Sequence, residues 1–162
     1  MTNIQKALEL IHTFANGDAE KAAGLLAEGY IQHNLAYGTG RDAFAGSIAS
    51  LASAPVKTTV NNIRSFEDGD KVFLQTVYNF AGAGEQVAFD IFRFDESGKI
   101  AEHWDNLAAK AEPNPSGRTQ IGGAPTAYYD LWRVENGKIA EHWDVVETIA
   151  DESTWQNENG KF

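Results

Sequence analysis

Residues 89–105 read FDIFRFDESGKIAEHWD, and this stretch decides how the second half of the chain folds. Apolar and polar side chains alternate from Gln86 to Phe94 and again from Lys99 to Ala108, which is the pattern of strands with one buried face. Asp95 to Gly98 lies between the two runs and has the composition of a turn. The stretch therefore predicts an antiparallel hairpin.

Another alternating pair precedes this hairpin. Val56 to Phe66 and Lys71 to Phe80 are typical of strands, and Asp68-Gly69 between them is a hairpin turn signal. Before Pro55 the apolar residues recur with the helical period instead. The strands should therefore form one antiparallel meander that starts after Pro55.

The first third of the chain is expected to be helical, because its apolar residues recur on one helical face. The expected helices cover residues 2–17, 18–29 and 39–55, capped by Thr2, by Asp18 and by Thr39 or Asp42, with an extended segment at 30–34. Helices followed by a strand meander favour an α+β fold. We expect a curved antiparallel sheet wrapped around the N-terminal helices, forming a cone with an internal pocket.

The composition narrows the class of protein. The chain has 162 residues, a length typical of one domain, and we take residues 1–162 as a single unit. The formal net charge of −10 argues against nucleic acid as a partner, and nothing in the sequence suggests a membrane. The chain has no cysteine, which excludes disulfides and a thiolate nucleophile. Together with the lack of a signal peptide, this composition predicts a cytoplasmic protein.

Part of the sequence occurs twice. The eight residues GKIAEHWD occupy positions 98–105 and recur without change at 137–144. The flanking residues are also similar, so we interpret 125–147 as a second copy of the hairpin at 86–108. A polar connector, Ala111 to Pro125, separates the two copies.

The first copy carries candidate catalytic residues. Strand alternation puts His103 and Asp105 on one face, and a turn that closes with Phe94 opposite Lys99 places Asp90 opposite His103. A carboxylate beside an imidazole orients the ring, and desolvation in an apolar pocket makes a carboxylate a better base. We therefore take Asp105, His103 and Asp90 as the candidate catalytic residues.

The second copy offers an alternative site made of Asp130, His142 and Asp144. Its turn is one residue shorter than the turn of the first copy. A three-residue loop places Asp130 opposite His142, whereas a two-residue turn at Asn136-Gly137 places it opposite Trp143 and breaks the pairing. We favour the first copy, because the second follows a connector of about fifteen residues, which is long for a compact domain.

Polar and aromatic residues near these copies are candidates for substrate binding. Tyr30, His33 and Asn34 form a polar cluster that could donate hydrogen bonds to a developing oxyanion. Trp104 is a candidate platform for a ligand, although a core position is the more usual role for tryptophan. The four histidines show no compact ligand spacing, so we expect no metal site.

Three stretches together resemble the SnoaL-like polyketide cyclase group of the nuclear-transport-factor-2-like superfamily. They are Tyr30 to Asn34, Phe89 to Asp95 and Gly98 to Asp105, and their order and spacing match those of the family. The resemblance implies a cone of helices wrapped by a bent sheet, a homodimer formed through the sheet, and an acid-base site that needs no cofactor.

The resemblance also implies roles for single residues. In the family's cyclases an aspartate at the position of Asp105 removes an activated C–H proton for an intramolecular aldol closure. His103 lies beside it, and His33 and Asn34 match a polar pair on the first extended segment. Leu35 departs from the family pattern, which continues with proline.

The C-terminal part of the chain departs further from the family pattern. Residues 114–119 and residues 155–162 each resemble the C-terminal end of a family member. The chain could therefore be a recombinant in which two strand pairs compete for one place in the sheet.

Three hypotheses remain open at this point. The first is a lyase or isomerase that abstracts a proton next to a carbonyl, with Asp105 as the base. The second is a protein that binds a small apolar or carbonyl-containing ligand in the same pocket without turnover. The third is a chimera whose duplicated hairpin is structural.

Overall fold

The computed structural model describes residues 1–110 and 126–160. The expected connector, Ala111 to Pro125, lies outside the described residues. The elements, in chain order, are α1 (Asn3–Asn16), α2 (Ala19–Leu25), β1 (Leu26–Gln32), α3 (Arg41–Ala52), β2 (Thr59–Asp68), β3 (Lys71–Asn79), η1 (Phe80–Gly82), β4 (Gln86–Phe94), β5 (Ile100–Ala109), β6 (Thr126–Glu135), β7 (Lys138–Thr148) and η2 (Glu152–Thr154).

The caps of the first two helices are the predicted ones. Thr2 and Gln5 form a reciprocal capping box at the start of α1, and Gly17 ends this helix with a positive φ of 76°. Asp18 caps α2 by accepting a hydrogen bond from the backbone of Lys21. However, α2 ends at Leu25 rather than near residue 29, because the chain turns directly into β1.

The cap of α3 differs from the prediction. Gly40 is the N-cap residue and makes no side-chain hydrogen bond, so neither Thr39 nor Asp42 caps the helix. The hydroxyl of Thr39 instead accepts a hydrogen bond from the backbone N–H of Gln32 at 3.2 Å. This bond joins the end of β1 to the loop just before α3.

Five strands form one curved sheet in the order β1-β5-β4-β3-β2. The meander from β2 to β5 is antiparallel, as predicted. Strand β1 pairs parallel to β5, so the sheet is mixed and not wholly antiparallel. A parallel pair needs a long connection between its two strands. Between β1 and β5 this connection consists of α3 and strands β2 to β4.

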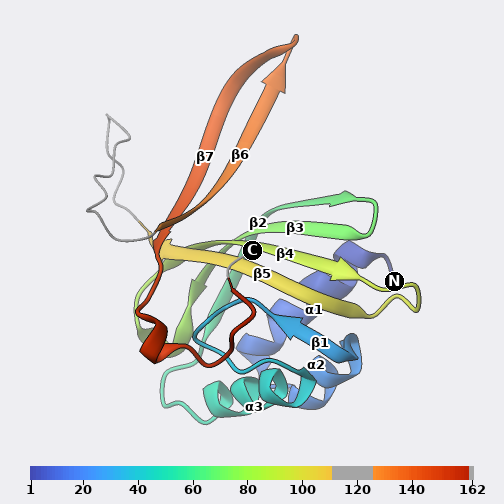
Figure 1. Ribbon diagram of the computed structural model, residues 1–162, viewed down its shortest axis with the longest axis vertical. Coiled ribbons are helices and arrows are strands. Elements are labelled where there is room, and N and C mark those ends of the chain that lie inside the picture. The colour runs from blue at the N-terminus through green and yellow to red at the C-terminus, as the bar shows by residue number, and fades with distance from the viewer. Residues whose placement is uncertain (111–125, 161–162) are drawn as a thin grey trace.

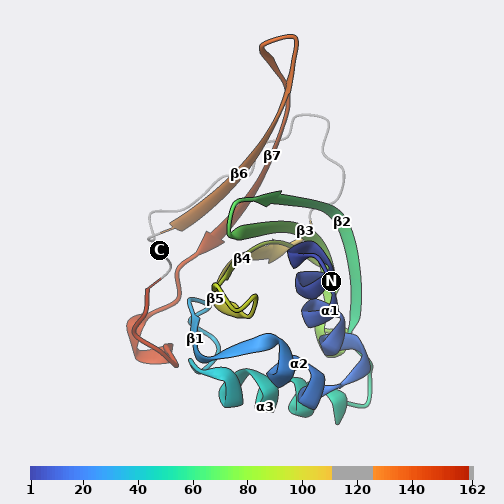
Figure 2. The ribbon, with the colours of Figure 1, turned by 90° about the vertical axis from the view of Figure 1, so that its right-hand side faces the viewer.

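The sheet curls around α1, while α2 and α3 cover its open side (Figures 1 and 2). The inner face of the sheet and the apolar faces of the helices form one core, and this arrangement confirms the expected α+β cone. The fully buried side chains of the core include Leu10, Ile11, Tyr30, Ile48, Val72, Leu74, Tyr78, Phe92 and Ile100.

A β-bulge sets the register of the first-copy hairpin. Phe94 pairs with Ile100, but Arg93 pairs with Glu102, which leaves Ala101 as the extra residue. Asp90 consequently lies opposite Asp105, so the predicted pairing of Asp90 with residue 103 is wrong. The error is two residues, an even shift that leaves every side chain on its predicted face.

The second-copy hairpin has the same register as the first. Its turn is the two-residue turn at Asn136-Gly137, both with positive φ, but a bulge at Ala140 follows. Asp130 therefore lies opposite Asp144, which differs from both of the registers considered for this hairpin. The first copy has the same bulge at Ala101, so the one-residue difference is confined to the loop, which is residues 95–99 in the first copy and 135–138 in the second, and the pairing is the same in both.

The β6–β7 hairpin, called the arm below, projects away from the sheet and helices (Figures 1 and 2). Its base is fastened to β5 by the buried side chain of Asn106, whose Nδ2 donates to the carbonyl oxygens of Ala127 and Val145 at 3.0 and 2.8 Å. The backbone N–H of Leu107 donates to Glu147 at 3.1 Å.

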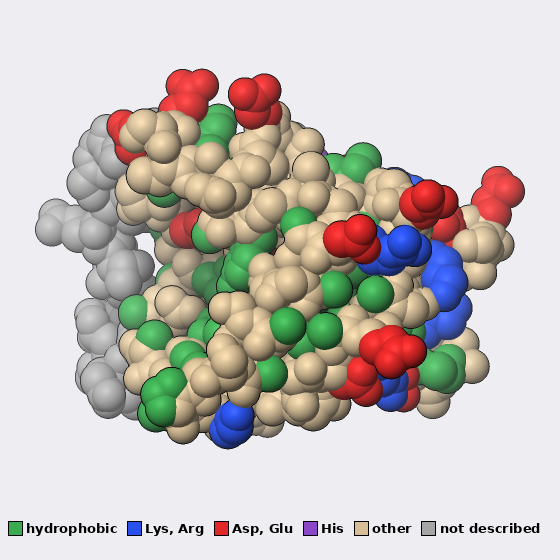
Figure 3. Space-filling view, turned by 90° about the horizontal axis from the view of Figure 1, so that it is seen from below, with side chains coloured by type: hydrophobic (Ala, Val, Ile, Leu, Met, Phe, Trp, Pro, Cys, Tyr) green, Lys and Arg blue, Asp and Glu red, His purple; other side chains and the backbone are tan. Residues whose placement is uncertain are grey.

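Among the described residues, no helix is long and apolar enough to cross a membrane. On the face that Figure 3 shows, most lysine and arginine side chains lie close to carboxylates, and they form no extended basic tract.

Candidate active site

A cavity of about 260 Å³ lies between the helices and the inner face of the sheet. Its size is near the lower end of the range of small-molecule sites, about 300–1,000 Å³. One part of the wall is aromatic and comes from Phe14, Phe44, Tyr78 and Phe80. The rest is polar and includes Asp90, His103, Asp105, Asn34 and Tyr37.

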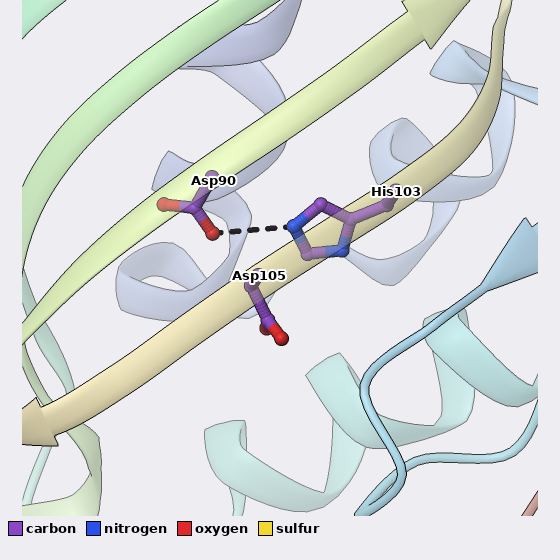
Figure 4. Close-up of side chains that lie close together, drawn as sticks. All are labelled: Asp90, His103 and Asp105. Atoms are coloured by element: carbon purple, nitrogen blue, oxygen red, sulfur yellow. Dashed lines mark hydrogen bonds and ion pairs between the residues drawn. The ribbon is translucent and has the colours of Figure 1, made fainter. Parts of the chain in front are cut away.

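Asp90, His103 and Asp105 come together on this wall (Figure 4). None is more than 5% exposed. Nε2 of His103 lies 3.2 Å from Oδ1 of Asp90. One ligand atom from each of the three falls within 4.8 Å of the others, so this cluster is where the described residues could hold a cation.

Two further contacts fix the Asp90–His103 pair. The hydroxyl of Tyr78 donates to Oδ2 of Asp90 at 2.9 Å. The ring of Phe92 stacks on the imidazole of His103 with ring centroids 4.4 Å apart. Nδ1 of His103 is buried and makes no hydrogen bond to the described residues.

Asp105 is held from the other side of the cavity. Nδ2 of Asn34 donates to Oδ2 of Asp105 at 2.7 Å. The amide oxygen of Asn34 accepts from the backbone of Ala36, and the backbone N–H of Asn34 donates to the side chain of Gln32. The loop thus fixes the orientation of the amide before any ligand binds.

Tyrosines around the cluster remain protonated well into the alkaline range. Burial raises the pKa of Tyr30 and of Tyr78 well above the ordinary value, and the carboxylates of Asp90 and Asp105 raise both further. Burial and then Asp105 also raise the pKa of Tyr37. Tyr37 therefore presents a neutral hydroxyl donor in the cavity wall.

The sequence matches the family model described as the SnoaL-like domain over residues 7–103. The chain belongs to the SnoaL-like family. No curated protein sequence matches it significantly.

Solved structures of this fold are similar at low sequence identity. An NTF2-like protein of unknown function from Cytophaga hutchinsonii has a TM-score of 0.57 and 18% identity, covering 67% of this chain and 91% of that one. A putative ketosteroid isomerase from Kribbella flavida has a TM-score of 0.55 and 17% identity, covering 75% and 90%. An LEH-like epoxide hydrolase from M. tuberculosis has a TM-score of 0.58 and 16% identity, covering 65% and 82%. These likenesses establish the fold of the SnoaL-like chain and no more.

Of the four residues expected to bind substrate, Asn34 lines the cavity and three lie elsewhere. Tyr30 is buried in the core behind the cavity wall. His33 stacks on Trp104 with ring centroids 4.8 Å apart, on the other face of the sheet. These three residues therefore have no place in the cavity wall.

His33 has a structural tie of its own. Its Nε2 lies 2.8 Å from Glu102, and its Nδ1 lies 3.0 Å from the carbonyl oxygen of Gly160. Both partners are acceptors, so both bonds form only when the imidazole carries two protons. Burial alone would raise the pKa of Glu102, but hydrogen bonds from His33 and Arg93 outweigh it and hold that pKa below its usual value.

The second-copy residues lie outside the cavity. His142 and Asp144 are exposed on the arm, as is Asp130, whose Oδ1 lies 2.7 Å from Nε2 of His142. Trp132 stacks on the imidazole with ring centroids 3.7 Å apart. The hairpin alone therefore reproduces the carboxylate, imidazole and aromatic arrangement of the first copy, but outside the cavity.

The core explains why the first copy occupies the cone. Ala88 is fully buried on the inner face of β4, and the equivalent residue in the arm is Tyr128. A tyrosine at that position would have to displace core side chains or enter the cavity, whose wall includes the neighbouring residues Gln86, Asp90 and Leu107. This difference favours the first copy beneath the helices.

The sequence analysis did not name Tyr37, Tyr78 or Glu147 as site residues, although all three line the cavity. Strand alternation along β3 could have placed Tyr78 on the inner face, together with Leu74 and Thr76. No sequence signal places Tyr37 or Glu147, because a loop and the base of the arm bring them to the cavity.

Proposed function

We propose that this SnoaL-like protein is an acid-base lyase or isomerase that acts on a small carbonyl compound without a cofactor. The observation that carries the proposal is the buried cluster of two carboxylates and one imidazole in a cavity whose wall is partly aromatic and partly polar. Two similar structures are named as a putative ketosteroid isomerase and an epoxide hydrolase. Their names suggest that this fold can host enzymatic sites.

In the proposed reaction, Asp105 removes a proton from the carbon next to the substrate carbonyl, and the electron pair moves to the carbonyl oxygen. The neutral hydroxyl of Tyr37 donates to the resulting enolate oxygen. Asn34 holds Asp105 in place at 2.7 Å. The enolate then either takes the proton back at another carbon or attacks a second carbonyl of the same molecule, as in an aldol closure.

The pair formed by Asp90 and His103 has a supporting role in this proposal. Tyr78 fixes one oxygen of Asp90, and His103 lies against the other. Because Nε2 faces this carboxylate, Nδ1 is the imidazole nitrogen left for the substrate. This arrangement suits the binding of a polar substrate atom beside the reacting carbon.

Hydrogen-deuterium exchange into small ketones and β-dicarbonyl compounds, followed by proton NMR, tests the proposal. We expect Asp105→Asn to slow the exchange by about 10²- to 10⁴-fold, the usual contribution of a positioned base. The matched control is Asp144→Asn, which makes the same change in the second GKIAEHWD copy and should leave the exchange rate unchanged.

Exchange that survives Asp105→Asn and disappears in Asp144→Asn would overturn the assignment in favour of the arm. If the wild-type protein catalyses no exchange but the same compounds broaden or shift its resonances, the site is a binding pocket without turnover.

A further inference from the structure

The base of the arm contributes a carboxylate to the cavity. Glu147 on β7 is one of the residues of the cavity wall, and its side chain accepts a hydrogen bond from the backbone N–H of Leu107 at 3.1 Å. Leu107 follows Asp105 by two positions on β5 and lines the same cavity. Because two residues of a strand span roughly 7 Å, the carboxylate of Glu147 lies about that far along β5 from Asp105.

This carboxylate belongs to the second copy alone. When the two GKIAEHWD sequences are aligned, the first-copy equivalent of Glu147 is Ala108. The duplicated hairpin therefore adds to the cavity an acidic group that a single hairpin of this sequence would not supply.

The charged side chains of the cavity are mainly acidic. Asp90, Asp105 and Glu147 line it, and none of the described residues in its wall is a lysine or an arginine. Figure 4 shows two of these carboxylates beside the imidazole of His103. That imidazole can carry at most one positive charge against three carboxylates. The cavity should therefore attract cations and repel anions.

Tyrosines near the cavity are affected by this negative charge. Burial and then the carboxylate of Asp105 raise the pKa of Tyr37. Close to the base of the arm, burial and then the carboxylates of Asp105 and Glu147 raise the pKa of Tyr129. Carboxylates that hold these phenols in the neutral form also favour a positive charge on a bound ligand.

The aromatic part of the wall suits a positive charge as well. Phe14, Phe44, Tyr78 and Phe80 line it. The faces of aromatic rings attract ammonium groups, and the attraction is stronger where water is excluded. A wholly apolar ligand would also fit against these rings, but it would remove water from the carboxylates without replacing its hydrogen bonds, which is unfavourable. An ammonium group satisfies both parts of the wall.

We propose that the ligand of this cavity is a carbonyl compound that also carries an ammonium group, which Glu147 binds while the carbonyl end lies against Asp105 and Tyr37. This inference rests on the proposed function, because it uses the same cavity and the same base. The cavity volume of about 260 Å³ limits the ligand to a small compound. The carboxylates along the wall disfavour keto acids and other anionic carbonyl compounds.

The binding of three methyl ketones tests this ligand class. The three share a three-carbon spacer and end in a dimethylammonium group, an isopropyl group or a carboxylate, so they differ mainly in charge. We expect the ammonium ketone to bind about tenfold more tightly than the isopropyl ketone, and the carboxylate ketone to bind most weakly. NMR titration of the protein measures the three dissociation constants, and added salt should weaken the binding of the ammonium ketone.

Glu147→Gln tests the contribution of the arm. The amide oxygen of glutamine can still accept from the backbone of Leu107, so the substitution removes the charge and keeps the contact. We expect this variant to bind the ammonium ketone about tenfold more weakly and the isopropyl ketone as before. Glu141→Gln is the matched control, because Glu141 lies on the same strand but is exposed outside the cavity. Far-UV circular dichroism checks that both variants are folded.

The outcomes distinguish this inference from the catalytic proposal, because binding is measured at equilibrium without turnover. Equal affinity for the three ketones, no detectable binding of the ammonium ketone, or unchanged affinity in Glu147→Gln would overturn the ammonium site. Selective binding of the ammonium ketone without proton exchange would support the ammonium site and contradict the lyase or isomerase. Proton exchange into neutral ketones without selectivity for the ammonium ketone would do the reverse.

Discussion

Tyr78 connects the aromatic and acidic parts of the cavity. Its ring lines the wall, and its hydroxyl donates to Asp90 at 2.9 Å. The two residues lie on neighbouring strands and are 12 positions apart in the sequence. Alternation predicts the face of each residue, but only the register of β3 against β4 brings hydroxyl and carboxylate together.

The raised pKa of Tyr78 predicts a loss of stability at high pH. The folded-state pKa of Tyr78 lies above the unfolded value of about 10. The stabilisation that this shift provides is therefore fully present below pH 10 and is lost as the pH rises toward the folded-state pKa. Once the unfolded-state tyrosine has ionised, each such residue lowers the free energy of unfolding by roughly 1.4 kcal/mol per pH unit. Urea unfolding at several pH values above and below 10 measures this slope.

The variant Tyr78→Phe distinguishes the loss of stability caused by ionisation of Tyr78 from losses caused by other groups that ionise at high pH. We expect the variant to be less stable near pH 8, because Asp90 loses a buried donor, but to lose stability less steeply above pH 10. Tyr128→Phe, a change on the exposed arm, should keep the wild-type slope. Equal slopes in the wild type and Tyr78→Phe would contradict the assignment.

At the scale of elements, the two hairpins show that strand pairing is a local property. Each has a bulge at the alanine of its Lys-Ile-Ala sequence, and each places its aspartates opposite one another. The turns differ by one residue, yet the registers agree, because the difference is confined to the loops 95–99 and 135–138 and both strands pair in the same way beyond them. The helices are not needed for this register, since the arm adopts it away from them (Figure 1).

The residue beneath the helices decides which hairpin enters the cone. We expect Ala88→Tyr to destabilise the fold by about 1–3 kcal/mol, because the site is fully buried and a phenol ring would have to displace neighbouring core side chains or fill the cavity. The reciprocal change, Tyr128→Ala, removes an exposed side chain and should alter stability by less than about 0.5 kcal/mol. Urea unfolding in dilute solution compares the two, and similar costs would show that the positions are equivalent after all.

At the scale of the whole molecule, the end of the described chain returns to the cavity loop. Nδ2 of Asn157 donates to the carbonyl oxygens of Asn34 and Tyr37 at 3.1 and 2.9 Å. Asn159 donates to the carbonyl oxygen of Gln32 at 2.6 Å. The tail therefore ties down the loop that presents Asn34 to Asp105.

Removing this tie should affect both stability and the site. We expect Asn157→Ala to lower the free energy of unfolding by about 1–3 kcal/mol, because two carbonyl groups lose a buried donor. The loop should also hold Asn34 less firmly and slow the proposed proton exchange. Glu158→Ala is the control, since Glu158 is the exposed neighbour. Unchanged melting and exchange in Asn157→Ala would show that the tail is not part of the site.

The sequence alone determined the helices, the meander and the face on which Asp90, His103 and Asp105 lie, because local periodicity and turn residues control these features. It also revealed the duplication. The parallel β1–β5 pair and the choice between the hairpins depended on the tertiary structure. These features depend on contacts between residues that are far apart in the sequence. Ala88, for example, is fully buried, and no local sequence pattern shows how much space the core leaves at that position.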